Sequence, residues 1–394
     1  MRLAVVSPFV DRQHGTERSV AELIERLARD YHFEIHLYAQ YVEDLNLVPS
    51  EGLHSGSDGG IIWHRVPSLP GPHVVQFLSW LLINRLCRIG DGLFRRLTFD
   101  LVLSPGVNCL DADVIVVHAV FHRLVELQEE SEARGLRALH RNLYYRVLRG
   151  LERRLYGSPH VHLASVSPHT SRQLLKYFGR GDVVIAPPGV DMNGFSPEKR
   201  KQRRGAAREV WNFSEDAQVL LMIGNDWRNK GLPVLLQAAG LCSDLPLRLL
   251  IVGQEDPAKF EKQVSSLGLS NRVTFAPPSA DVLEFFAAAD VYVAPSLEDS
   301  FNLPVLEAMA CGLPVIVSVC AGVSDWIHDE VDGLLLRNPT DAAELAMTLR
   351  KLLQNADSMQ RLGNAAAQTA ATFTWDQHAA RIHELLVKSG KRKP

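Results

Sequence analysis

The sequence predicts an α/β protein built from two doubly wound parallel-sheet domains. Short β-branched runs alternate with segments of helical periodicity along nearly the whole chain. This alternation is typical of parallel sheets that helices cover on both faces. The length of 394 residues also favours two domains, since a domain usually takes about 100–200 residues.

Each half of the chain contains its own series of expected strands. In the first half they are Leu3–Val6, Phe33–Tyr38, Ile61–Val66, Leu101–Leu103, Val114–Val117 and His162–Val166. In the second half they are Val219–Ile223, Arg248–Val252, Val273–Phe275, Val291–Ala294, Val315–Val319 and Gly333–Leu336. Helical periodicity lies between many of them, as in RSVAELIERLARD and LPVLLQAAGL.

A Pro- and Gly-rich stretch that ends in a basic run separates the two halves (IAPPGVDMNGFSPEKRKQRRGAAR). This composition is typical of a linker, so we expect the domain boundary near residues 185 and 186. Ligands of such sheets bind beyond the carboxyl ends of the strands. With two domains, the expected site is the cleft between them.

Composition excludes several classes of protein. Hydrophobic residues make up 46% and charged residues 22%, which rules out disordered, collagen-like and coiled-coil chains. The net charge of -3 argues against a nucleic-acid partner. No CxxC spacing occurs, so we expect reduced thiols at Cys87, Cys109, Cys242, Cys311 and Cys320.

No signal peptide or membrane span is expected. The apolar stretch of MRLAVVSPFV is short, and no run approaches the ~20 apolar residues of a span. We therefore expect a cytoplasmic protein that meets a membrane, if at all, from its surface.

Arginine is concentrated in the first half of the chain, where residues 1–175 contain no lysine. Seven arginines and a single acid, Glu152, lie between Ala133 and Gly157. A second group follows the apolar patch Val74–Ile83 and consists of Arg85, Arg88, Arg95 and Arg96. Two interpretations remain open: a solvated helix face with domain packing, or contact with an anionic membrane surface, where each basic group contributes ~1 kcal/mol.

The most informative segment runs from Ala294 to Val317 (APSLEDSFNLPVLEAMACGLPVIV). It predicts the end of a strand, a loop with two acids, and a helix that Asn302 caps before Leu303 and a proline. Gly312 is the expected stop after this helix. The unpaired N–H groups and the positive dipole end at such a helix start favour a phosphate.

Two carboxylates flank this helix start. Asp299 lies in the loop before it, and Glu307 lies about 7 Å along the helix axis. Carboxylates suit the vicinal hydroxyls of a ribose or hexose, because each accepts two hydrogen bonds. For an isolated pair of acids, a turn-forming aspartate and a solvated helix residue would be the better interpretation.

The complete string resembles family 4 of the nucleotide-sugar glycosyltransferases, which are retaining enzymes with two Rossmann-like domains facing across a cleft (the GT-B fold). The resemblance is carried by two acids with seven residues between them, followed by Ala-Met-Ala-Cys-Gly-x-Pro-Val. Asp299 and Glu307 keep this spacing. The family usually has Glu in place of Asp299 and Gly in place of Asn302, and Glu298 is a candidate substitute for the missing Glu.

The segment LLMIGNDWRNKGLPVLLQAA resembles the strand, glycine and basic pair that open the family's second domain. Lys230 before Gly231 matches the family's lysine, and we expect Arg228 to replace the arginine, because Asn225 stands near its usual place. In the family these cations face the donor diphosphate, and fixed cations stabilise a leaving diphosphate. The alternative is a solvated basic turn.

The first half matches less closely. In SPFVDRQHGTERSVAELIERLA, Gly15 matches the second glycine of the family's loop and His14 replaces the first. A glycine there lets the backbone approach a ligand closely. ADVIVVHAVFHR places His118 at a strand end, where the family often has an active-site histidine, and His122 is a weaker candidate. The alternative for His118 is a structural histidine.

The resemblance implies a domain plan and a set of roles. Residues 1–185 would bind the acceptor, residues 186–372 the donor, and residues 373–394 would form a helix that packs back on the first domain. Glu307 would hold the ribose, and Gly15 and His118 would complete the site from the first domain. The sugar would be positioned by Asp299 and the backbone of Ser300, Phe301, Asn302 and Leu303.

The implied activity is hexosyl transfer from a UDP- or GDP-sugar to a hydroxyl of a glycan or lipid-linked acceptor in cell-envelope synthesis. Anomeric retention, a front-face attack and independence of metal and cofactor are implied by the family alone. Asp111-Ala112-Asp113 mimics the DxD of metal-dependent transferases, and we interpret it as chance. The rival functions are a nucleotide-sugar epimerase or hydrolase, and a non-catalytic nucleotide-sugar-binding protein.

Overall fold

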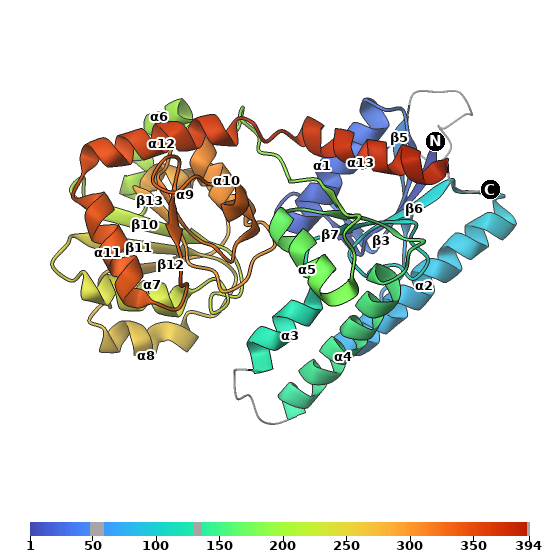
Figure 1. Ribbon diagram of the computed structural model, residues 1–394, viewed down its shortest axis with the longest axis horizontal. Coiled ribbons are helices and arrows are strands. Elements are labelled where there is room, and N and C mark those ends of the chain that lie inside the picture. The colour runs from blue at the N-terminus through green and yellow to red at the C-terminus, as the bar shows by residue number, and fades with distance from the viewer. Residues whose placement is uncertain (48–58, 130–135, 392–394) are drawn as a thin grey trace. The chain divides into compact units, whose positions relative to one another are not determined.

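The computed structural model describes residues 1–47, 59–129 and 136–391. The chain forms two compact units, one of which combines Met1–Pro188 with the C-terminal segment from Trp375. The other consists of Gly189–Thr374 (Figure 1). Both are α/β units, and no described helix combines the length and apolarity that crossing a bilayer requires.

The described part of the first unit contains a parallel sheet in the order β5-β3-β1-β6-β7-β8-β9. Its strands are β1 (Arg2–Val6), β3 (Glu34–Ala39), β5 (Gly60–Arg65), β6 (Leu101–Pro105), β7 (Val114–Val117), β8 (His162–Ser165) and β9 (Val184–Ile185). A short parallel pair, β2 (Phe9–Val10) and β4 (Tyr41–Val42), extends the loops after β1 and β3. The central strands are buried, as continuous β-branched runs predict.

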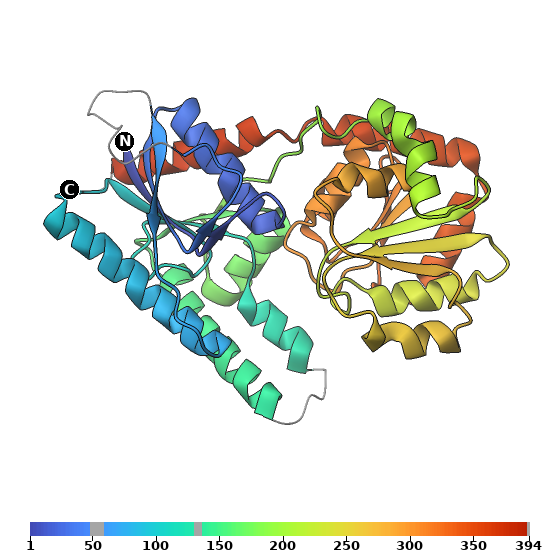
Figure 2. The same ribbon diagram turned by 180° about the vertical axis from the view of Figure 1, so that it is seen from behind.

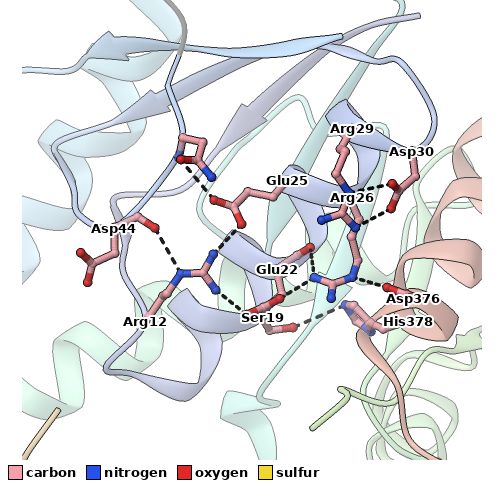
Figure 3. Close-up of polar contacts among 11 residues, drawn as sticks. Arg12, Ser19, Glu22, Glu25, Arg26, Arg29, Asp30, Asp44, Asp376 and His378 are labelled. Carbon is pink, nitrogen blue, oxygen red and sulfur yellow. Dashed lines mark hydrogen bonds and ion pairs between the residues drawn. The ribbon is translucent and has the colours of Figure 1, made fainter. Parts of the chain in front are cut away.

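Helices cover this sheet on both faces. They are α1 (Gly15–Arg29), α2 (His73–Phe94), α3 (Phe121–Glu129), α4 (Leu136–Tyr156), α5 (Pro168–Phe178) and α13 (Trp375–Gly390). The last of these packs along α1, where the Arg26 guanidinium donates to the Asp376 carboxylate at 2.6 Å (Figure 3). The two long helices α2 and α4 lie side by side in both views (Figures 1 and 2).

The second unit contains a six-stranded parallel sheet in the order β12-β11-β10-β13-β14-β15. Its strands are β10 (Gln218–Ile223), β11 (Leu247–Val252), β12 (Val273–Ala276), β13 (Val291–Ala294), β14 (Val315–Ser318) and β15 (Leu334–Leu336). Its helices are α6 (Pro197–Val210), α7 (Leu232–Leu241), α8 (Ala258–Ser266), α9 (Val282–Ala288), α10 (Leu303–Ala310), α11 (Ala342–Leu353) and α12 (Ala356–Ala370), with a 3₁₀ turn at Gly322–Trp326.

Both sheets follow the doubly wound strand order, in which the chain starts in the middle and then fills each side in turn. The predicted fold class of two Rossmann-like α/β domains is thereby confirmed. In each sheet the order reverses between the first strand and its neighbour, which is β1 beside β6 and β10 beside β13. Ligands of such sheets bind at the carboxyl ends of the strands at this point.

The basic run that the composition assigned to a linker is a helix instead. Residues Pro197–Val210 form α6, whose first turn is capped by the Ser196 hydroxyl accepting from the Lys199 N–H at 3.2 Å. Arg200, Arg204 and Arg208 recur at every fourth residue, so they share one face. That face donates to the Ala289 carbonyl and the Asp290 carboxylate. The arginines are therefore structural parts of the second unit.

Candidate functional site

In the second unit, two predicted residues meet beyond the carboxyl ends of β10 and β13. Lys230 lies in the turn after β10, and Asp299 lies in the loop after β13. The Lys230 Nζ and Asp299 Oδ2 atoms are 2.5 Å apart, and their side chains are only 19% and 14% exposed. The structure therefore holds a mostly shielded ion pair at the switch point of this sheet.

The backbone holds these two loops together. The Leu297 N–H donates to the Asn229 carbonyl at 2.8 Å, and the Asn229 Nδ2 donates to the Glu298 carbonyl at 2.9 Å. Asn229 and Glu298 directly precede Lys230 and Asp299 in the chain. The position of the ion pair is thus fixed by main-chain hydrogen bonds as well as by the attraction of the two charges.

Gly231 allows the loops to approach so closely. Its φ of 82° lies in the left-handed region, which favours glycine. A Cβ atom built there would lie 2.0 Å from the Pro295 carbonyl oxygen. A residue with a side chain would therefore push the Lys230 turn away from the Asp299 loop.

Arg228, the predicted second cation, lies in the same turn but has a different environment. Its side chain is exposed, and its guanidinium has no partner among the described residues. Its backbone carbonyl accepts from the Gly231 N–H at 3.1 Å, which helps to shape the turn. The structure places Arg228 near Lys230 along the chain and does not tie it to either predicted carboxylate.

The loop from Asp299 to Leu303 is ordered by its own hydrogen bonds. The Asp299 Oδ1 accepts from the Phe301 N–H at 3.3 Å, and the Asp299 carbonyl accepts from the Gly322 N–H at 2.8 Å. The loop therefore leads into α10, which begins at Leu303, in a fixed path. Ser300 is half-exposed in this loop.

The expectation that the Asn302 side chain caps α10 is wrong. Asn302 occupies the N-cap position with a φ of 73°, and its side chain makes no capping hydrogen bond. Its amide Nδ2 instead donates to the Ser296 Oγ at 3.4 Å. Asn is among the few residues other than Gly that adopt this left-handed conformation, which explains how it stands where the resembling family has Gly.

Asp299 and Glu307 both act electrostatically on one buried phenol, that of Tyr292. The Tyr292 hydroxyl donates to the Ile223 carbonyl at 3.3 Å, at the end of β10. Burial raises the pKa of Tyr292, and the nearby carboxylates of Asp299 and Glu307 raise this pKa further. Glu307 itself is 3% exposed, in the second turn of α10. Both predicted acids therefore lie close enough to Tyr292 to raise its pKa, and Glu298, next to Asp299 in the chain, is also buried.

The first unit contains a cavity of about 340 Å³ beyond the carboxyl ends of β1, β3, β6 and β7. His118, the residue that follows β7, is part of its wall. The rest of the wall is mainly aromatic, amide and backbone groups, including Phe9, Gln40, Gln76, Phe77, Trp80, Asn108 and Tyr144. No Lys, Arg, Asp or Glu is among the described residues that line it.

His118 is held neutral in this wall. Burial and, to a smaller extent, the nearby His378 of α13 lower its pKa to about 3. The His378 Nδ1 lies 3.1 Å from the Ala186 carbonyl, so this nitrogen carries the proton, while its Nε2 lies 3.5 Å from the Ser19 hydroxyl (Figure 3). The two histidines therefore link the cavity wall to the packing of α13 on α1.

Gly15 and His122 differ in what surrounds them. Gly15 is the first residue of α1 and is exposed, and a Cβ atom there would meet nothing within 4 Å. The fold therefore does not require glycine at this position, and its predicted contact with a ligand stays a prediction. His122 is buried with its Nδ1 2.6 Å from Glu152, which also accepts from the Phe121 N–H. This geometry gives His122 a structural role at the start of α3.

Two features of the first unit were not anticipated from the sequence. The Trp80 indole donates to the Asn108 carbonyl at 2.9 Å, which joins two sides of the cavity wall. His378 lowers the pKa of His118, although more than half of the sequence separates the two residues. The only local signal would have been an indole and an imidazole on otherwise apolar helix faces.

The Asp111-Ala112-Asp113 motif is used by the fold itself. The Asp111 carboxylate pairs with the buried Arg88 guanidinium at 2.6 Å. The Asp113 Oδ2 accepts from the Val102 N–H at 2.8 Å, beside the start of β6. Both carboxylates thus have structural contacts within the first unit.

Two family models match the chain. The model described as Glycosyltransferase Family 4 matches residues 14–193, and the one described as Glycosyl transferases group 1 matches residues 203–369. Together they account for most of the chain. The protein therefore belongs to family 4 of the glycosyltransferases.

Curated relatives carry the name D-inositol 3-phosphate glycosyltransferase. The protein of Paenarthrobacter aurescens (strain TC1) is 32% identical over 231 residues, which are 55% of each chain. The protein of Geodermatophilus obscurus is 34% identical over 223 residues, 52% of this chain and 48% of the relative. The chain spans about half the length of the curated relatives it matches.

Solved structures with the same fold cover nearly the whole chain. WaaG, a glycosyltransferase involved in lipopolysaccharide biosynthesis, aligns with a TM-score of 0.78 at 21% identity over 98% of this chain and 99% of its own. Sucrose-phosphate synthase from Thermosynechococcus elongatus aligns with a TM-score of 0.75 at 21% identity, over 98% of each chain. HepE from Anabaena, solved with UDP and glucose, aligns with a TM-score of 0.70 at 18% identity, over 98% of this chain and all of its own.

The contact between Gly231 and Pro295 generates a stability prediction. We expect Gly231→Ala to lower the free energy of unfolding of the second unit by about 3 kcal/mol, because it combines left-handed strain with a steric clash. The matched control is Gly268→Ala, where φ is 68° but nothing lies within 4 Å of the added Cβ. That control should cost only ~1 kcal/mol. Thermal unfolding measures both, and equal losses would contradict the proposed close approach.

Proposed function

We propose that this protein is a glycosyltransferase that moves a hexose from a UDP- or GDP-sugar to a hydroxyl acceptor, with retention at the anomeric carbon. The observation that carries the proposal is the shielded Lys230–Asp299 ion pair at the carboxyl edge of the second sheet. It places a fixed cation and a fixed carboxylate at a ligand-binding switch point, inside the region that matches group 1 of the glycosyltransferases.

The donor diphosphate is assigned to Lys230 and Arg228. A lysine ammonium has three donor hydrogens, so Lys230 can keep its contact with Asp299 and still donate to a phosphate oxygen. Arg228 is exposed in the same turn, so all the N–H groups of its guanidinium can donate to a phosphate. We propose that these cations, without a metal ion or cofactor, stabilise the negative charge that the leaving diphosphate gains.

The sugar and the ribose are assigned to the carboxylates. Asp299 and the backbone from Ser300 to Leu303 would position the hexose, because this loop follows a fixed path at the entrance to α10. Glu307 would accept hydrogen bonds from the ribose hydroxyls. The proposed front-face mechanism, in which a donor phosphate oxygen takes the acceptor proton, is the one that the family resemblance implies.

The acceptor is assigned to the cavity of the first unit. Its wall offers aromatic faces and neutral hydrogen-bonding groups, which suit a sugar or another uncharged hydroxyl compound. A phosphorylated acceptor, such as the names of the curated relatives indicate for those proteins, would favour arginine or lysine in the wall. We therefore propose a neutral glycan hydroxyl or the sugar of a lipid-linked glycan.

The pathway and location that we propose are cell-envelope polysaccharide or glycolipid synthesis at the inner face of the membrane. WaaG is involved in lipopolysaccharide biosynthesis, and HepE was solved with UDP-glucose. These proteins share the fold, and they support a UDP-sugar donor and an envelope acceptor as the first candidates to test. The corresponding partner is an anionic membrane surface, with which the protein would associate peripherally.

Two other functions remain as alternatives. An epimerase or hydrolase would consume the donor without an acceptor, and a non-catalytic binder would never release free nucleotide. The left-handed Asn302 weakens the case for a degenerate site, because it preserves the backbone conformation that glycine adopts readily.

The nucleotide assignment predicts a ligand-dependent rise in melting temperature. One of UDP, GDP or ADP should raise it by several degrees, because a ligand at 100 times its Kd stabilises a protein by ~2.7 kcal/mol. In Glu307→Gln the rise should shrink, since the neutral amide accepts hydrogen bonds from the ribose less strongly.

The control for this prediction is Glu261→Gln, at an exposed position in α8 of the same unit. Its melting shift should equal that of the wild type. If no nucleotide raises the melting temperature, or if both variants respond alike, the assignment of the donor to this site is wrong.

The low pKa of His118 predicts the pH dependence of transfer. His118 stays neutral from pH 5 to pH 8, because its pKa of about 3 lies below this whole range. We expect His118→Asn to lower kcat while leaving the shape of the pH–rate profile unchanged in this range. An inflection of the wild-type profile near pH 6 that disappears in His118→Asn would contradict this account.

A further inference from the structure

Helix α2 carries a continuous apolar face that is exposed. Its residues follow one another at intervals of three and four, which places them along one side of the helix. We call this face the α2 stripe, and it consists of Val75, Leu78, Leu82, Leu86, Ile89 and Leu93, each between 47% and 73% exposed. The stripe is about 27 Å long, at 1.5 Å per residue.

The opposite face of α2 is fixed to the first unit. Trp80 and Asn84 are buried there, and the buried Arg88 pairs with Asp111 at 2.6 Å. Phe77, which the sequence placed in an apolar patch, turns to this side and packs edge-on against Tyr144 with 5.8 Å between the ring centroids. The helix is thus held in a rotation that keeps the stripe outward.

Basic residues border the stripe. Arg85, Arg95 and Arg96 are exposed on α2 or just after it. Arg146, Arg153 and Arg154 are exposed on α4, which lies beside α2 in both views (Figures 1 and 2). Of the other predicted arginines, Arg134 lies outside the described residues, as does the side chain of Arg137.

The few acids of these helices are used inside the fold. Asp91 is the only acidic residue in α2, and it accepts from the Tyr38 hydroxyl at 2.7 Å and contacts His64. It also pairs with the exposed Arg95 at 3.4 Å, so the charge of that arginine is partly balanced. Glu152 is the only acidic residue in α4, and it is fully buried against the start of α3. The described surface of the two helices is therefore apolar and positively charged.

We propose that the α2 stripe and its bordering arginines form a docking surface for an anionic lipid bilayer. An interfacial helix of this kind lies in the plane of the membrane, with its apolar face among the acyl chains and its cations at the headgroups. Charge favours lipid over a second copy of this chain, because pairing two stripes would bring like-charged arginines together.

The docking surface would set the place where acceptors are met. His73, Gln76, Phe77 and Trp80 of the same helix line the neutral cavity of the first unit. Docking through α2 would therefore bring this cavity to the bilayer surface, where the sugar of a lipid-linked acceptor lies. The docking surface deepens the membrane location in the proposed function and rests on it. Because vesicle binding is measured without donor or acceptor, a failure to dock is distinguishable from a failure of sugar transfer.

The test is flotation of the full chain with lipid vesicles. We expect binding to vesicles of phosphatidylcholine mixed with phosphatidylglycerol at about 0.15 M salt, and much weaker binding to phosphatidylcholine alone. Binding should weaken further as the salt concentration rises. Absence of binding to the anionic vesicles would overturn the proposal.

Two matched triple variants locate the surface. Leu82→Gln, Leu86→Gln and Leu93→Gln together should reduce vesicle binding about tenfold or more, because they remove apolar side chains from the bilayer. The control combines Leu175→Gln, Leu241→Gln and Met347→Gln, which change residues of similar exposure, 55% to 65%, on other helices. It should bind like the wild type, and equal losses in both variants would overturn the assignment to α2.

The molecular mass in solution tests whether a second copy of the chain covers the stripe instead of a membrane. Light scattering should give the same mass for the wild type and the stripe variant. A dimer that the stripe variant converts to a monomer, together with unchanged vesicle binding, would show that the stripe is covered by a second copy and would overturn the proposal.

Discussion

The close approach of two loops at the carboxyl edge of the second sheet is the constraint on which the donor site depends. Gly231 has no side chain to separate the Lys230 turn from the Pro295–Asp299 loop. Main-chain bonds through Asn229 then hold the loops in register, and the Lys230–Asp299 ion pair closes the contact. Because both partners are mostly shielded from water, their attraction is stronger than that of a surface pair.

The two units offer different chemistry at equivalent edges of their sheets. The second unit places a lysine and acidic residues beyond β10 and β13, which suits a charged and hydroxyl-rich ligand. The first unit places a neutral histidine, amides and aromatic rings beyond β1 and β7, which suits an uncharged one. This division agrees with a donor on the second unit and an acceptor on the first, the assignment that we propose.

The sequence predicted the features that depend on local patterns. Each expected strand is present within two residues of its predicted bounds, because β-branched runs report burial directly. The basic run was wrongly assigned to a linker. Its arginines form one face of a helix that hydrogen-bonds to Ala289 and Asp290, and a contact with residues about 80 to 90 positions away cannot be read from the local pattern. The outward stripe of α2 could not be predicted, because periodicity shows that a helix has an apolar face but not which face the fold covers.

The most direct test of the central claim compares a nucleotide with its nucleoside by calorimetry. If Lys230 binds the donor diphosphate, the wild type should bind UDP at least about tenfold more tightly than uridine, and this ratio should fall towards one in Lys230→Met. GDP and guanosine form the second pair, should uridine and UDP both fail to bind. A ratio that Lys230→Met leaves unchanged would contradict the account, because the diphosphate would then lie elsewhere.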